Sequence, residues 1–126
     1  MRKIMIVDDN YLSAEGIEKN IDWEVLNAEI VHICYNGTSA IDAMKKEPVD
    51  LIISDIEMPD LDGISMSRQA LDINPMVKII LISAYDKILK YARRALLLGA
   101  LDYIEKPLDY AYLIQKVKKC FCPDGT

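Results

Sequence analysis

The chain of 126 residues has few of the residues from which disulfide scaffolds, zinc sites and low-complexity segments are built. It contains three cysteines, one histidine, five glycines and five prolines. Cys120 and Cys122 are too close in sequence to pair comfortably, and His32 is distant from both. Neither a disulfide framework nor a zinc site is therefore expected.

Excess positive charge and long apolar runs are also missing. The formal net charge is −5, which argues against nonspecific nucleic-acid binding, since that requires a basic face. No apolar stretch reaches the roughly 18 residues of a membrane-spanning helix. The first residues, MRKIMIVDD, predict a strand and not a secretory signal. We expect a cytoplasmic protein without membrane contact, in which any DNA contact belongs to another segment.

The residues that are present predict a compact globular fold. Hydrophobic residues make up 52% of the chain and charged residues 28%, which is ordinary for globular proteins. A chain of this length can bury one core but not two independent ones. We expect one domain over residues 1–122 and a short frayed tail over residues 123–126.

Apolar runs alternate with segments of helical periodicity along the chain. Unbroken aliphatic runs are typical of parallel strands that are covered on both faces, and short loops between alternating elements predict right-handed crossovers. The sequence therefore predicts an α/β fold, a doubly wound sheet of five parallel strands with five helices on its two faces. The expected strands are residues 4–7, 28–35, 51–54, 78–82 and 101–105, and the expected helices are residues 10–20, 38–46, 64–73, 86–98 and 108–120.

Polar residues follow four of the predicted strands. Asp8 and Asp9 come after the first strand, Asp55 after the third, Ser83 after the fourth and Lys106 after the fifth. Because parallel strands bring their carboxyl ends to one edge of a sheet, where ligands bind, we expect these side chains to meet there. The set predicts a phosphoryl-transfer site.

The three carboxylates of this set repel one another unless cations are bound. One Mg²⁺ and the Lys106 ammonium would bring the formal charge of Asp8, Asp9 and Asp55 to −3 + 2 + 1 = 0. Hard oxygen donors without imidazole or thiolate favour Mg²⁺. Beside such an ion Asp55 is the candidate nucleophile toward a phosphoryl group. Lys106 and Ser83 offer a charge and a hydroxyl to the phosphoryl oxygens.

Each of these residues can also be explained by a purely structural role. Asp8 and Asp9 could be helix N-caps, Asp55 could be a turn residue at the end of its strand, and Ser83 could cap the helix that follows it. Lys106 could be a solvated surface lysine. For each residue alone, such an explanation competes with a role in the site. The joint occurrence of these residues at four strand ends favours the site.

The motifs resemble, in order and spacing, the receiver domain of two-component response regulators over residues 2–120. The shared motifs are Val7-Asp8-Asp9, Ser54-Asp55-Ile56-Glu57-Met58-Pro59 followed by Asp62-Gly63, Ser83-Ala84, and Tyr103 with Lys106-Pro107. The stretches Ile21-Asp22-Trp23-Glu24 and Ser83-Ala84-Tyr85-Asp86 with Tyr91-Ala92 further resemble the subgroup with an AraC-type DNA-binding domain after the receiver.

This resemblance implies the flavodoxin-like or CheY-like strand order 2-1-3-4-5 and a phosphoryl group accepted on Asp55 from a sensor histidine kinase. It implies that Asp9, Asp55 and the backbone carbonyl of Glu57 bind Mg²⁺, with Asp8 acting through water. The protein would catalyse only its own phosphorylation and dephosphorylation. Asn10 departs from the family, in which a third acidic residue is frequent at this position.

The resemblance also implies a switch. Ser83 and Lys106 would bind phosphoryl oxygens, and Tyr103 would turn inward when Ser83 moves. The output would be transcription regulation through an effector domain beyond residue 126. We further predict phosphorylation-dependent homodimers through an apolar patch of Leu97, Leu101 and Tyr103.

Two readings from other classes remain. In a Mg²⁺-dependent phosphohydrolase, an aspartyl nucleophile is followed two residues later by a second acid, as Glu57 follows Asp55 here. Such enzymes need a cap or pocket for the substrate, and the chain is too short for a cap. A metal-free interaction module is disfavoured because every charged position of the site is filled. A receiver that acts alone, without DNA-binding output, is a further alternative.

Overall fold

The computed structural model describes residues 1–84, 94, 99 and 102–121. Five strands and four helices lie in these ranges. They are β1 (Arg2–Val7), α1 (Tyr11–Lys19), β2 (Ala28–Cys34), α2 (Gly37–Lys46), β3 (Leu51–Asp55), α3 (Gly63–Ile73), β4 (Lys78–Ala84), β5 (Asp102–Lys106) and α5 (Tyr110–Phe121). The helix predicted over residues 86–98 lies outside the described residues, except for Arg94.

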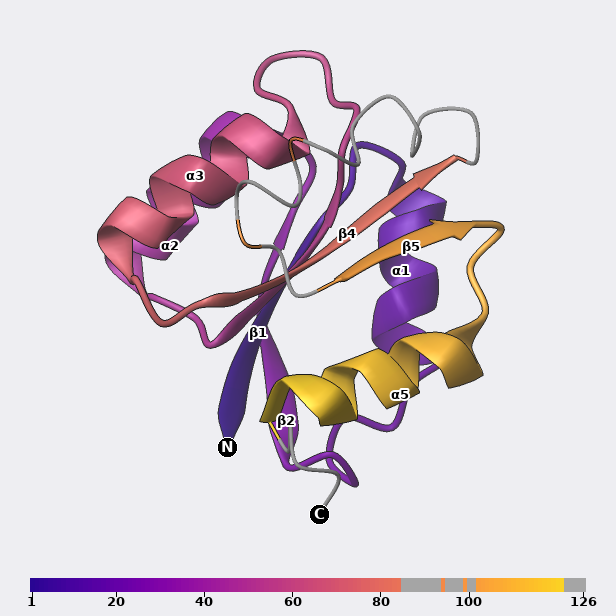
Figure 1. The fold of residues 1–126 in the computed structure, drawn as a ribbon. Coiled ribbons are helices and arrows are strands. Elements are labelled where there is room, and N and C mark those ends of the chain that lie inside the picture. The colour runs from indigo at the N-terminus through magenta and orange to yellow at the C-terminus, as the bar shows by residue number, and fades with distance from the viewer. Residues whose placement is uncertain (85–93, 95–98, 100–101, 122–126) are drawn as a thin grey trace.

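The five strands form one parallel sheet in the order β2-β1-β3-β4-β5, which confirms the predicted strand order. Helices α2 and α3 cover one face, and α1 and α5 cover the other (Figure 1). Strand β3 lies at the centre. Asp55 at its end is in register with Ile82 of β4, and Ala84 of β4 is in register with Lys106 of β5. The carboxyl ends of the central strands therefore meet at one edge.

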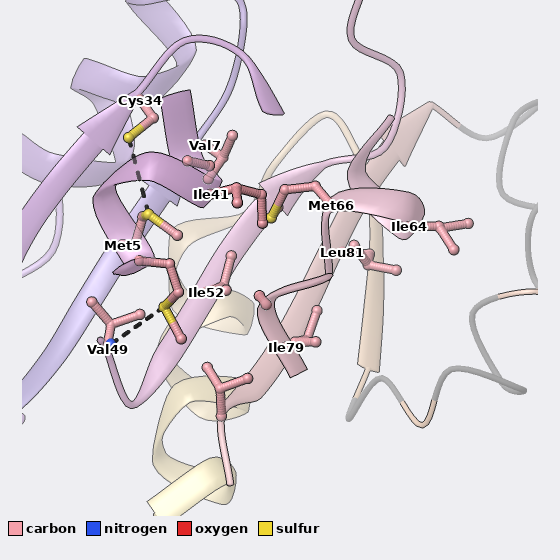
Figure 2. Close-up of a cluster of buried hydrophobic side chains, with 14 of the residues drawn as sticks. Met5, Val7, Cys34, Ile41, Val49, Ile52, Ile64, Met66, Ile79 and Leu81 are labelled. Carbon is pink, nitrogen blue, oxygen red and sulfur yellow. Dashed lines mark hydrogen bonds between the residues drawn. The ribbon is translucent and has the colours of Figure 1, made fainter. Parts of the chain in front are cut away.

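Each face of the sheet carries its own apolar core. Successive strand residues point to opposite faces, so Met5 and Val7 pack under α2 and α3 (Figure 2), whereas Ile4 and Ile6 pack toward α1 and α5. This explains why the runs do not alternate with polar residues. Cys34 is buried in the first core, where its Sγ lies 4.0 Å from the Met5 Sδ.

The β1–β2 pairing contains an irregularity that the sequence analysis did not predict. Ile4 pairs with Ile30, but Met5 pairs with His32, so that β2 has one extra residue, Val31. This β-bulge lies in the outermost strand of the sheet. Val31 packs against the α2 and α3 core, and because of the bulge Ile33 packs against the same core as Ile30, on the other face.

Side chains of the residues directly before α1 and α2 cap the N-termini of these helices. Asn10 accepts a hydrogen bond from the Ser13 backbone N–H at 3.1 Å, and Asn36 accepts one from Ser39 at 2.7 Å. Both are N-caps of the expected type. No helix in the described ranges is long and apolar enough to cross a membrane.

The start of α5 differs from the prediction. The sequence predicts that this helix begins at residue 108, after Pro107, but α5 begins at Tyr110. The Asp109 carboxylate accepts a hydrogen bond from the Ala111 backbone N–H at 2.9 Å and so caps the helix. The peptide bond between Lys106 and Pro107 is cis, and Pro107 belongs to the turn before the cap.

Candidate functional site

Three carboxylates meet at the carboxyl edge of the sheet, as the sequence predicts. Each of Asp8, Asp9 and Asp55 offers an oxygen that lies within 4.8 Å of the oxygens of the other two. Asp8 and Asp55 are only 2% and 8% exposed, whereas Asp9 is exposed. Oxygen donors at this separation can share one hard divalent cation such as Mg²⁺.

Burial makes the charges of this cluster costly. It raises the pKa of the Asp8 carboxyl, which the Asn10 backbone N–H partly offsets by donating a hydrogen bond at 2.9 Å. Burial likewise raises the pKa of the Asp55 carboxyl, against the lowering effect of Lys106. Because the charged forms are disfavoured in both cases, a bound cation would stabilise the ionised site.

The N-cap reading of Asp8 and Asp9 is wrong. The N-cap of α1 is Asn10, whose side chain binds the Ser13 backbone N–H. The Asp8 carboxylate instead accepts from the Asn10 backbone N–H, which holds it at the end of β1. Both acidic residues therefore lie before the cap, and the helix does not need them.

Lys106 makes a specific contact within the site. Its Nζ lies 3.3 Å from Oδ2 of Asp55, and its side chain is 35% exposed. The reading of Lys106 as a solvated surface lysine is therefore wrong. The ammonium can stabilise negative charge on Asp55 or on a group attached to it.

Ser83 and Tyr103 lie on the two strands beside this contact. Ser83 is buried within β4, which continues to Ala84 instead of ending at Ile82. Tyr103 is partly buried against the α2 and α3 core and is in register with Leu81. Of the predicted apolar patch, Leu97 and Leu101 lie outside the described residues.

The loop between β3 and α3 depends on a glycine to which the sequence analysis gave no structural role. The Gly63 backbone N–H donates to the Ile56 carbonyl at 2.6 Å. A Cβ atom at Gly63 would overlap the carbonyl oxygen of Asp55 and lie 3.0 Å from the Ile56 Cα. The first residue of α3 is therefore packed directly on the backbone of the candidate nucleophile. The signal in the sequence was the Asp62-Gly63 pair, in which Asp62 caps α3.

Two hollows flank the carboxylates. One of about 390 Å³ is lined by Asp8 and Lys106 together with residues of α1 and of the turn before α5. The other, of about 400 Å³, is lined by Asp9, Glu57, Met58, Pro59 and Asp62. Asp8 and Asp9 are thus accessible to a small ion from these hollows, although the Asp8 side chain is buried.

We expect the metal-free Asp8→Asn variant to be more stable than the wild type at neutral pH. Asn keeps the acceptor for the Asn10 N–H and removes a buried charge. Since the pKa of Asp8 is raised in the folded state, the folded wild type binds a proton more tightly than the unfolded chain, and its relative stability rises as the pH falls. The advantage of the variant should therefore shrink in acid. Urea unfolding with EDTA at neutral and mildly acidic pH measures this; a pH-independent difference would contradict it.

Comparisons of the sequence and of the structure with known proteins agree on one family. The family model described as "Response regulator receiver domain" matches residues 4–118. An uncharacterized transcriptional regulatory protein, YesN of Bacillus subtilis, is 27% identical over 119 residues, which are 94% of this chain and 32% of that protein. The chain therefore spans about a third of the length of this relative.

Solved structures agree over nearly the whole chain. The REC domain of AraT, a response regulator from Geobacillus stearothermophilus, matches with a TM-score of 0.87 at 31% identity and covers 99% of this chain and 98% of its own. A two component transcriptional regulator AraC from Clostridium phytofermentans ISDg matches with a TM-score of 0.89 at 30% identity, covering 96% and 93%. These neighbours support the resemblance to the AraC-type subgroup.

Proposed function

Because this chain belongs to the family of response regulator receiver domains, we propose that it accepts a phosphoryl group on Asp55 from a sensor histidine kinase. The observation that carries the proposal is the juxtaposition of three carboxylates within 4.8 Å of one another with an ammonium 3.3 Å from one of them. The carboxylates suit a hard cation, and the ammonium suits the anionic phosphoryl group.

Asp55 is the residue that we assign as the phosphoacceptor. One of its carboxylate oxygens attacks phosphorus, an O–P bond forms, and the P–N bond of the donor phosphohistidine breaks, with its electron pair leaving on the imidazole. When bound, Mg²⁺ would screen the approach of the two anions and help to align the phosphoryl group. Asp9, Asp55 and the Glu57 backbone carbonyl would hold it, with Asp8 acting through water. Lys106 and the Ser83 hydroxyl then bind phosphoryl oxygens.

These contacts are strong enough to drive a conformational switch. Reversing a 1:99 equilibrium requires about 5.5 kcal/mol of differential interaction. Charge-assisted hydrogen bonds from Ser83 and Lys106, at about 1.5 to 3 kcal/mol each, are of that order. The movement of Ser83 toward the phosphoryl group would let Tyr103 turn inward, as the resemblance implies.

The output that we propose is transcription regulation in the cytoplasm, through an effector domain joined to this receiver. It is supported by relatives that are named as transcriptional regulators and in which the matched segment fills 25% to 48% of the chain. A receiver over residues 1–122 with a linker from residue 123 fits this arrangement. Homodimerisation through Leu97, Leu101 and Tyr103 also stays a prediction, which sedimentation with and without beryllofluoride would test.

The family assignment favours this reading over a Mg²⁺-dependent phosphohydrolase. Labelling with a small phosphodonor tests the choice, because a receiver takes up at most one phosphoryl group per chain, while a hydrolase turns over a phosphomonoester many times. Sustained turnover of a phosphomonoester by the purified domain would reject the receiver function.

Replacing Asp9 with Asn should weaken Mg²⁺ binding at least about tenfold, since even the outer partners of metal ligands are worth 10- to 100-fold in affinity. Asp9 is exposed and does not cap α1, so the fold should persist. Titration calorimetry measures the affinity, and Asp42→Asn, which changes an exposed aspartate on α2, is the matched control. Equal Mg²⁺ affinity in Asp9→Asn and the wild type would remove Asp9 from the ligand set.

A further inference from the structure

Hydrogen bonds to an aspartate connect the β3–α3 loop to α2, a helix that comes earlier in the sequence. The function described above gives this aspartate no role. Asp60 Oδ1 accepts a hydrogen bond from the Gly37 backbone N–H at 3.2 Å, and its Oδ2 accepts one from Thr38 at 3.1 Å. These are the first two N–H groups of α2, which lack partners within the helix. Asn36 binds a third, that of Ser39. The N-terminus of α2 is thus capped partly by Asn36, the residue directly before the helix, and partly by Asp60 of the loop.

The backbones of the loop and the helix also touch. A Cβ atom added to Gly37 would lie 2.5 Å from the Leu61 carbonyl oxygen and 2.7 Å from the Leu61 Cβ. The Leu61 side chain packs against the α2 and α3 core. The tip of the loop is therefore fixed by backbone contact as well as by the Asp60 carboxylate.

The charge of Asp60 suits this position. The Thr38 hydroxyl, with backbone N–H groups of Thr38, Leu61 and Gly37, lowers the pKa of the Asp60 carboxyl to about 2. The carboxylate thus stays ionised at neutral pH, where it interacts favourably with the positive end of the α2 dipole. The negative charge of Asp60 is therefore compensated at the N-terminus of α2.

We propose that Asp60 is a positioning residue, which uses the N-terminus of α2 to hold the β3–α3 loop so that the Glu57 carbonyl can bind the metal ion. This inference rests on the proposed function. The loop is held at two points, Gly63 against the Asp55 backbone and Asp60 against α2, and Glu57 lies between Asp55 and Asp60 in the sequence. Loss of one fixed point leaves the carbonyl less ordered before the ion binds, which lowers affinity.

The test compares two caps of the same helix. Asp60→Ala removes the cap that comes from the loop, and Asn36→Ala removes the cap that comes from the residue directly before the helix. Both should lower the urea midpoint of unfolding to a similar extent. Only Asp60→Ala should weaken Mg²⁺ binding in titration calorimetry, by about tenfold, the low end of the range for outer partners of metal ligands. Asp60→Asn, which keeps one acceptor oxygen, should recover part of the affinity.

A second variant reaches the loop without touching Asp60. Gly37→Ala should also weaken Mg²⁺ binding, because its Cβ displaces the Leu61 carbonyl. The inference is overturned if Asp60→Ala weakens Mg²⁺ binding no more than Asn36→Ala does, while the wild type binds Mg²⁺ and is labelled on Asp55. A wild type that does not bind Mg²⁺ would instead overturn the metal dependence of the proposed function, and this inference with it.

Discussion

Replacing Asp55 with Asn should reduce phosphoryl incorporation from acetyl phosphate and Mg²⁺ to background. The amide that replaces the carboxylate is a poor nucleophile, and it no longer carries the charge that faces Lys106 at 3.3 Å. Radiolabel counting or intact-mass spectrometry measures the incorporation. Removal of Mg²⁺ with EDTA should abolish labelling of the wild type as well.

The control for this loss is Asp109→Asn. Asp109 is another aspartate beside a strand end, and an asparagine at this position can still cap α5 by accepting from the Ala111 N–H. The control variant should be labelled like the wild type. Asp55→Asn should remain folded, since it removes a buried charge. Equal incorporation in Asp55→Asn and the wild type would reject Asp55 as the phosphoacceptor.

Replacing Gly63 with Ala should destabilise the protein by about 1 to 3 kcal/mol, the usual cost of overpacking. The added methyl group meets the carbonyl oxygen of Asp55 and the Ile56 Cα, which are backbone atoms of a central strand and the residue after it. Such atoms cannot turn away as the end of a side chain can. Labelling should fall as well, because relief of the overlap moves the nucleophile.

Gly16→Ala is the matched control for this prediction. Its Cβ would meet the hydroxyl of Tyr110, which is the far end of a flexible side chain. Gly16 also lies within α1, where Ala is more favourable than Gly by about 0.5 to 1 kcal/mol. Urea unfolding should therefore show little or no loss for Gly16→Ala. A similar loss in both variants would show that the Gly63 contact has no special importance.

Local patterns were enough to predict the sheet and the carboxylate cluster. The aliphatic runs that end at Val7 and Ser54 are buried on both faces, so their strands had to be parallel and central. Parallel strands necessarily bring their carboxyl ends together, which is why Asp8 and Asp55 meet. The N-caps Asn10 and Asn36 were not predicted, although their contacts are local, since each side chain accepts from the backbone N–H three residues later.

Contacts between distant residues could not be predicted in this way. The role of Asp60 depends on Gly37 and Thr38, which precede it by 23 and 22 residues. Nothing in the residues around Asp60 indicates these partners. The prediction of the start of α5 was wrong for a different reason. Pro107 and Asp109 are both residue types that favour helix starts. Only the three-dimensional path of the turn shows that Asp109 is the cap.

The bulge at Val31 has a consequence for the solubility of the protein. Strand β2 lies at the border of the sheet, where exposed backbone groups could template the addition of a strand from another molecule. A bulge interrupts the regular spacing of such groups and increases the local twist. Edge-to-edge aggregation along β2 is thereby disfavoured.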